Sequence, residues 1–157
     1  MPSKPKSSGG KPTRLPYSTI DEKLCFALYS SSLAMLQTYK PMLAALGLTY
    51  PQYLVMLVLW EGDGVSVKHL AERLGQDPGS VTPLVKRLDE AGFLVRQRDV
   101  QDERNLNIEL TQSGRALQEK AEAASMKFAL ACHLTLPEGE ELRDKLAALS
   151  KTLRAST

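Results

Sequence analysis

The sequence predicts a mainly α-helical domain that carries a small β-hairpin. Three observations favour this fold class. Apolar residues recur at helical spacing over most of the chain, capping residues precede several of these segments, and two short alternating segments flank a charged turn. With 157 residues, of which 43% are hydrophobic, the chain is long enough to bury one core. We therefore expect a single domain over residues 18–157.

Residues 1–17 are rich in Pro, Gly, Ser and Lys, and we expect them to form a disordered arm. The arm lacks the apolar segment of a secretory signal, and no apolar run in the chain approaches the ~20 residues that span a bilayer. Two cysteines, Cys25 and Cys132, are too few to suggest a disulfide scaffold. These features predict a cytoplasmic protein with no membrane partner and with thiols in a reducing compartment.

Two helices are expected in the first part of the domain. The first covers residues 19–46, where Thr19 and Glu22 would form a capping box. The second is capped by Thr49, with Gln52 completing a capping box, and ends at Gly62. Because the second helix is apolar on nearly all sides, we expect it to lie buried at the centre of the domain.

A helix-turn-helix is predicted next. Its first helix begins after Ser66 and ends at Gly75, and its second helix is capped by Asp77, starts with Pro78 and extends to about Ala91. Two short helices separated by about three residues are typical of this motif. The second of them is the candidate reading helix.

The remaining chain predicts a β-hairpin and two helices. Residues 94–110 contain the two alternating segments around the charged turn, and this hairpin would form a wing beside the helix-turn-helix. A long helix would follow Thr111, and a last helix would follow a capping box of Thr135 and Glu138. The outer helices are amphipathic, and a second copy of the chain is the simplest partner for their apolar faces. We expect residues 48–114 to form the winged helix-turn-helix, and residues 18–47 and 115–157 to form dimerisation helices.

The predicted reading helix and wing carry the candidate DNA contacts. Val81, Leu84 and Leu88 would face inward, which leaves hydroxyl and basic side chains on the outer face. Short hydroxyls can reach base edges or phosphates, and basic side chains suit phosphates or guanine. A net charge of +2 does not by itself indicate nucleic-acid binding. A basic DNA-binding surface therefore depends on where the charged residues lie. The candidates are Ser80, Thr82, Lys86 and Arg87 in the helix and Arg96, Arg98, Asp102 and Arg104 in the wing.

The tip of the wing has two interpretations. Asp102 could fix the rotamer of Arg104, which would then enter a narrow and electronegative minor groove. Alternatively, the two residues form a solvated ion pair that contributes little. The adjacent helix-turn-helix favours the first interpretation.

The stretch "DPGSVTPLVKRLDEAGFLVRQRDVQDERNLNIELTQSG" resembles the winged-helix core of MarR-family transcriptional regulators. The D-x-R wing followed by Leu110 to Gly114 is particularly similar, and the resemblance extends from about Asp21 to Leu153. It implies a homodimer whose two reading helices enter successive major grooves of a pseudo-palindromic operator in double-stranded DNA. We expect this dimer to repress transcription, and activation stays open as the alternative. By position, the resemblance makes Arg104 the minor-groove arginine and Asp102 its positioning partner.

Within that family, "DEKLCFALYS" resembles the organic-hydroperoxide-sensing branch, often called OhrR. The resemblance implies that Cys25 is the residue oxidised by an organic hydroperoxide. It also implies that Tyr39 and Tyr50 hydrogen-bond to this cysteine, and Tyr29 matches a further aromatic position. Cys132 resembles the resolving cysteine of two-cysteine members, which implies an intersubunit Cys25–Cys132 disulfide and release of DNA.

The implied chemistry is physically reasonable. A thiolate attacks a hydroperoxide, and because an ordinary cysteine has a pKa of about 8.5, phenol donors or a helix N-terminus must favour the anion. Tyr39 follows Cys25 by nearly four helical turns, or about 21 Å along a straight helix at ~1.5 Å per residue. We therefore expect the tyrosines of one subunit to serve Cys25 of the other.

Other functions remain open at this point. A thiol peroxidase would also use an activated cysteine, but no surrounding motif supports an enzyme. A MarR-type regulator could instead respond to a small non-covalent ligand, with Cys25 only packing, or to a broader range of oxidants. A low-molecular-weight thiol could replace Cys132 as the resolving group. Cys132 and His133 are too few ligands for a zinc site, so no metal or other cofactor is expected.

Overall fold

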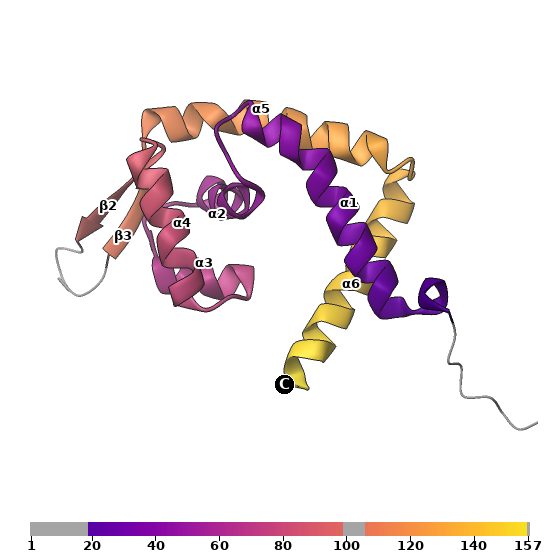
Figure 1. Cartoon of the computed structure of the whole chain (residues 1–157). Coiled ribbons are helices and arrows are strands. Elements are labelled where there is room, and N and C mark those ends of the chain that lie inside the picture. The colour runs from indigo at the N-terminus through magenta and orange to yellow at the C-terminus, as the bar shows by residue number, and fades with distance from the viewer. Residues whose placement is uncertain (1–18, 99–105, 157) are drawn as a thin grey trace, which may run out of the picture. The chain divides into compact units, whose positions relative to one another are not determined.

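The computed structural model describes residues 19–98 and 106–156. Its elements confirm the predicted class of a mainly helical chain with a small antiparallel sheet (Figure 1). In chain order they are η1 (Ile20–Glu22), α1 (Leu24–Ala44), α2 (Tyr50–Glu61), β1 (Val65–Ser66), α3 (Val67–Leu74), α4 (Pro78–Glu90), β2 (Leu94–Arg98), β3 (Leu106–Leu110), α5 (Gln112–Ala131) and α6 (Leu136–Ala155). Within the described ranges, every helix falls short of the combined length and apolar character that crossing a membrane requires.

The chain divides into two compact units at Ala34, and the first unit contains η1 and the start of α1. The predicted helix start at Thr19 is wrong. Residues 20–22 form a short 3-10 turn, Lys23 is extended with φ −86° and ψ 121°, and Thr19 makes no capping hydrogen bond with its side chain. The extended backbone at Lys23 separates this turn from α1, which begins one residue later.

The second unit, residues 35–157, contains α2 at the centre of its core. The predicted capping box is confirmed, because the Thr49 N–H donates to Gln52 Oε1 at 2.8 Å and the Gln52 N–H donates to Thr49 Oγ1 at 3.4 Å. Val55, Met56 and Leu59 are buried along this helix. The prediction of a buried central helix is therefore confirmed.

Helices α3 and α4 form the predicted helix-turn-helix. The His69 N–H donates to Ser66 Oγ at 3.1 Å at the start of α3, and the Ser80 N–H donates to Asp77 Oδ1 at 3.0 Å at the start of α4. Gly75, with φ 61°, ends α3 in the left-handed conformation that the turn needs. These local caps set the start of both helices and the end of α3.

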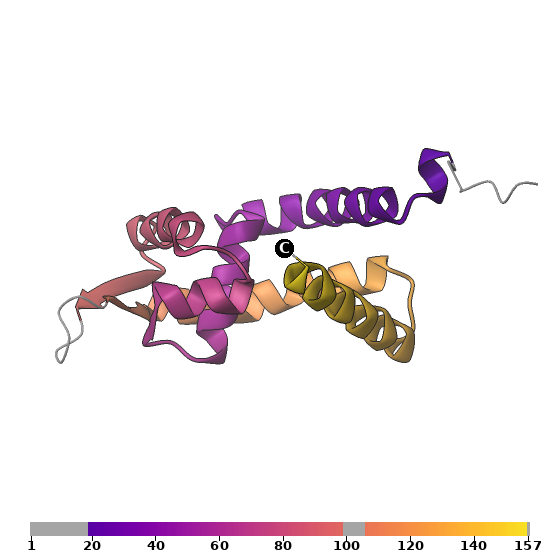
Figure 2. The same ribbon diagram turned by 90° about the horizontal axis from the view of Figure 1, so that it is seen from below.

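The sheet has the strand order β1-β3-β2. Strands β2 and β3 pair antiparallel from Leu94 with Leu110 to Arg98 with Leu106, which confirms the two strands of the predicted wing. The predicted tip, residues 99–105, lies outside the described residues. Strand β1 was not predicted, because two residues are too few to show an alternating pattern. Figure 2 shows the β2–β3 hairpin projecting beside α3 and α4.

Helices α5 and α6 complete the second unit. The Gly114 N–H donates to Thr111 Oγ1 at 3.1 Å, and Glu138 accepts from the Thr135 N–H at 2.8 Å, so both predicted helix starts are confirmed. Helix α5 contributes Ala121 to the core. Helix α6 has no buried residue, although it carries several leucines.

Candidate functional site

Helix α4 presents the predicted DNA-contacting residues at the protein surface. Ser80, Thr82, Lys86 and Arg87 are exposed, whereas Val81 and Leu88 on the opposite face are buried. This division agrees with the predicted inward and outward faces. Leu84 is only partly buried, and Val85 joins the inward face in addition.

The two hydroxyl groups of the reading helix already donate locally. Ser80 Oγ donates to Asp77 Oδ2 at 2.6 Å, and Thr82 Oγ1 donates to the Pro78 carbonyl at 2.8 Å. The hydroxyl and N–H of Ser80 together hold the pKa of the Asp77 carboxyl below its usual value. Each hydroxyl oxygen retains a lone pair, so in this arrangement it can accept a hydrogen bond from an amino group on a base edge.

The basic residues fall into two groups. Lys86 lies 3.9 Å from Glu90 in an exposed i,i+4 pair, and Arg98 is exposed at the end of β2. Arg96 is different, because its Nε donates to Asp89 Oδ2 at 2.7 Å and so connects β2 to α4. The predicted minor-groove pair, Asp102 and Arg104, lies outside the described residues.

Tyr39 and Tyr50 lie together in an aromatic cluster that joins α1, α2 and α5. The Tyr39 ring centroid is 5.3 Å from that of Tyr50, 5.7 Å from that of Tyr53 and 4.9 Å from that of Phe128. Tyr39 is almost completely buried, with 5% of its surface exposed. The structure therefore brings together the two tyrosines that the sequence singled out.

Both phenols are protonated at neutral pH, and burial moves their pKa values further from it. Burial raises the pKa of Tyr39 to about 12, and it also raises the pKa of Tyr50. Tyr39 hydrogen-bonds with Ser125 and Tyr53, while the Tyr50 hydroxyl lies 3.7 Å from Met35 Sδ and donates to it. In the single chain each phenol thus has a partner other than a cysteine, and each can act as a donor at neutral pH.

The two thiols lie on different units of the chain. Cys25 is exposed near the start of α1, one turn before Tyr29, which is also exposed. Cys132 is exposed at the C-terminal cap of α5, where its N–H donates to the Phe128 carbonyl at 3.1 Å. His133 follows it with φ 52°, an uncommon conformation for a residue with a side chain. Both thiols are accessible, as a reactive cysteine must be.

Four residues of the cluster were not predicted: Met35, Tyr53, Ser125 and Phe128. Tyr53 could have been found, because it follows Tyr50 by three residues and therefore shares its face of α2. Met35 could have been found in the same way, because it precedes Tyr39 by four residues on α1. Phe128 and Ser125 could not, since they reach the cluster only through the packing of α5. Their places depend on tertiary contacts that have no local signature.

Comparisons with known proteins agree with this arrangement. The family model of the SarA/Rot transcriptional regulators matches residues 37–121. The regulator TtmR of Methylorubrum extorquens is 44% identical over 137 residues, covering 87% of this chain and 70% of TtmR. The organic hydroperoxide resistance transcriptional regulator of Bacillus subtilis is 46% identical over 102 residues, covering 65% of this chain and 69% of that protein.

Solved structures of transcriptional regulators are also similar to this chain. Reduced AbfR bound to DNA, a protein of Staphylococcus epidermidis, matches with a TM-score of 0.74 and 32% identity, covering 87% of this chain and 93% of AbfR. A MarR-family regulator from a Rhodococcus species matches with a TM-score of 0.75 and 26% identity, covering 84% of this chain and 95% of that one. The helix-turn-helix, the two-stranded wing and these relatives together show that the chain belongs to the MarR family of transcriptional regulators.

Proposed function

We propose that this chain is a homodimeric DNA-binding repressor that releases its operator when an organic hydroperoxide oxidises Cys25. The observation that carries the proposal is an exposed Cys25 thiol in a chain whose buried Tyr39 and partly buried Tyr50 form a pair of protonated phenols. The similarity to the Bacillus subtilis hydroperoxide regulator supports it. So does the similarity to AbfR, whose structures include DNA-bound reduced and overoxidised forms and a disulfide form.

The proposed chemistry starts from a thiolate. The Cys25 thiolate attacks the terminal oxygen of the hydroperoxide, the O–O bond breaks, and the leaving alkoxide takes a proton to become an alcohol. Cys25 is left as a sulfenic acid. The Cys132 thiol of the other subunit then displaces water from this sulfenic acid, which gives an intersubunit disulfide.

Phenols can favour the thiolate because they donate hydrogen bonds to it. Tyr39 and Tyr50 are protonated at neutral pH, and in the proposed dimer they donate to Cys25 of the other subunit in exchange for their present partners. The N-terminal residues 18–47 and the C-terminal residues 115–157 would form the dimer interface. Residues 48–114 of each subunit would then read one half-site, with half-sites about 34–36 Å apart.

The test uses a DNA duplex selected by the reduced protein from a random pool, and cumene hydroperoxide as the oxidant. Cys25→Ser should bind the duplex as the wild type does and should stay bound after the hydroperoxide is added. Cys132→Ser should form the sulfenic acid but no subunit-linked species on a non-reducing gel. Release of the Cys25→Ser protein at the wild-type hydroperoxide concentration would contradict the proposal.

A second candidate function is regulation by a small aromatic ligand. Its support is a shallow hollow between α2 and α5, lined by Tyr53, Leu57, Trp60, Glu61, Gln118, Glu122 and Ser125. Two similar structures, at 27% and 29% identity, hold p-coumaroyl-CoA and salicylic acid. If this candidate is correct, salicylate should release the selected duplex from Cys25→Ser and from the wild type at the same concentration.

A further inference from the structure

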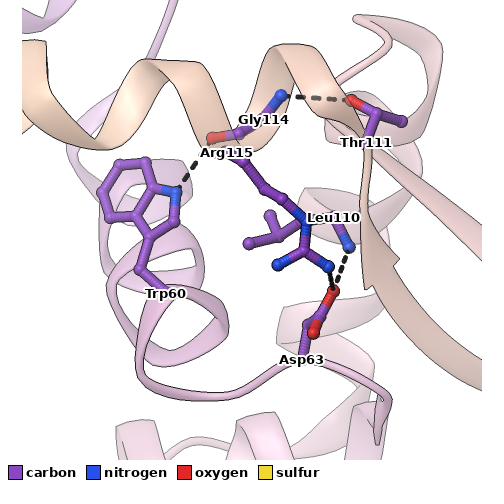
Figure 3. Close-up of polar contacts among 6 residues, drawn as sticks. All are labelled: Trp60, Asp63, Leu110, Thr111, Gly114 and Arg115. Carbon is purple, nitrogen blue, oxygen red and sulfur yellow. Dashed lines mark hydrogen bonds and ion pairs between the residues drawn. The ribbon is translucent and has the colours of Figure 1, made fainter.

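A polar junction joins the end of α2 to the last residue of β3 and the start of α5 (Figure 3). Asp63, just beyond α2, is central to it. Its Oδ2 accepts from the Leu110 N–H at 2.8 Å and from the Arg115 guanidinium at 2.6 Å. A single carboxylate therefore holds both the wing strand and the first turn of α5.

Trp60 forms the second connection of this junction. Its Nε1 donates to the Gly114 carbonyl at 2.9 Å. Gly114 lies close to the Phe93 backbone, and only glycine fits here because a Cβ would collide with the Phe93 carbonyl oxygen. Thr111 also connects the first turn of α5 to this backbone, since its hydroxyl donates to the Gly92 carbonyl at 2.6 Å. The start of α5 is thus fixed tightly against the backbone that leads from α4 into the wing.

The Trp60 ring also lies next to a ring of the aromatic cluster. The Trp60 and Tyr53 ring centroids are 6.4 Å apart, and the Tyr53 ring lies 5.7 Å from Tyr39 and 6.0 Å from Tyr50. A continuous series of contacts therefore leads from the two tyrosines through Tyr53 and Trp60 to Gly114. Chains of packed side chains and hydrogen bonds of this kind can carry energetic coupling between distant sites.

We propose that Trp60 is a positioning residue that couples the tyrosine cluster to the wing by holding the start of α5 through Gly114. A shift of the Tyr39 or Tyr50 ring moves Tyr53 against the indole, and the indole N–H transmits this shift to the turn that carries β3. The proposal rests on the proposed function in one respect: it assumes that the sensing event acts on Tyr39 and Tyr50. Coupling between this cluster and DNA binding is reciprocal.

The test is a double-variant cycle on reduced protein, with affinity for the selected duplex as the readout. Tyr39→Phe perturbs the cluster, and Trp60→Phe keeps a ring while removing the indole donor. We expect Tyr39→Phe to change the affinity at least three-fold in the wild-type background and less than 1.5-fold in the Trp60→Phe background. Arg143→Gln, which removes an exposed pair with Asp144 on α6, is the control and should preserve the full effect.

Equal effects of Tyr39→Phe in both backgrounds would overturn the proposal, and so would no effect in the wild type. Trp60 is the only tryptophan, so its fluorescence gives a second readout that needs no substitution at this position. Tyr39→Phe and duplex binding should each shift the emission of Trp60, and emission that neither changes would contradict the coupling. Because no oxidant is used, these results do not depend on whether Cys25 senses hydroperoxides.

Discussion

Tyr39 shows how burial prepares a side chain for the proposed sensor. Its ring is enclosed by Tyr50, Tyr53 and Phe128, and desolvation is the main reason why its pKa rises to about 12. A phenol with this pKa is a hydrogen-bond donor at every physiological pH. The same burial that stabilises the core therefore moves the ionisation of this donor further above physiological pH.

This shift makes a prediction about alkaline stability. In the unfolded chain the phenol ionises near its ordinary pKa of 10.0, but in the folded chain it ionises near 12. The stabilisation linked to Tyr39 is therefore complete below about pH 10 and is lost as the pH rises towards 12. Urea unfolding at pH 8, 10 and 11.5 should show a steeper loss of unfolding free energy for the wild type than for Tyr39→Phe.

Tyr29→Phe provides the matched control for this measurement. Tyr29 lies on the same helix but has 62% of its surface exposed, so Tyr29→Phe removes a hydroxyl outside the buried aromatic cluster. Absorbance at 295 nm followed through the same range should show one phenol fewer with late ionisation in Tyr39→Phe. Equal pH dependence of the wild type and Tyr39→Phe would show that Tyr39 ionises normally in the folded protein.

At the scale of elements, an ion pair between α4 and β2 links the wing to the predicted reading helix. The Arg96–Asp89 pair joins them at 2.7 Å, and 37% of the Arg96 side chain and 28% of the Asp89 side chain are exposed. A partly exposed pair contributes only about 0–1 kcal/mol to stability. Its main effect should therefore be orientation of the wing.

We predict that Asp89→Asn and Arg96→Gln each weaken binding to the selected duplex by a similar factor, roughly three- to ten-fold. The double variant should be no weaker than the single variants, because both lose the same contact. The salt dependence of binding should stay unchanged. If Arg96 instead contacts a phosphate, Arg96→Gln alone should weaken binding and should reduce the salt slope by about one.

Element boundaries were predictable where local chemistry sets them. Thr49 with Gln52, Ser66, Asp77 and Thr111 each cap a helix as the sequence indicates. The predicted start at Thr19 failed although its residue pattern also fits a capping box, because Lys23 adopts an extended conformation.

The candidate site was less predictable. The family resemblance identified Tyr39 and Tyr50 as site residues. The Trp60–Gly114 contact could not be predicted, because it depends on how α5 packs.

At the scale of the whole molecule, the most informative surface is the apolar face of α6. Leu142, Leu146 and Leu153 share one side of this helix, with 47%, 42% and 56% of their surfaces exposed. Leu136 and Leu130 nearby are exposed as well. A second copy of the chain would cover this apolar surface, in agreement with the proposed role of residues 115–157 in dimerisation.

Sedimentation of the wild type should therefore reveal a dimer. The double variant Leu142→Glu/Leu146→Glu should lower the affinity of dimerisation at least about 100-fold, because burying each leucine contributes ~1.5–3 kcal/mol. Ala147→Glu is the control, since it adds a charge to the side of α6 away from the leucines and should leave the dimer intact. Affinity for a duplex with two half-sites should fall together with dimerisation, whereas circular dichroism should show that each helix remains folded. A Leu142→Glu/Leu146→Glu protein that dimerises as tightly as Ala147→Glu would exclude this face from the interface. The exposed apolar residues on α1, Leu24 and Leu33, would then have to form the interface without α6.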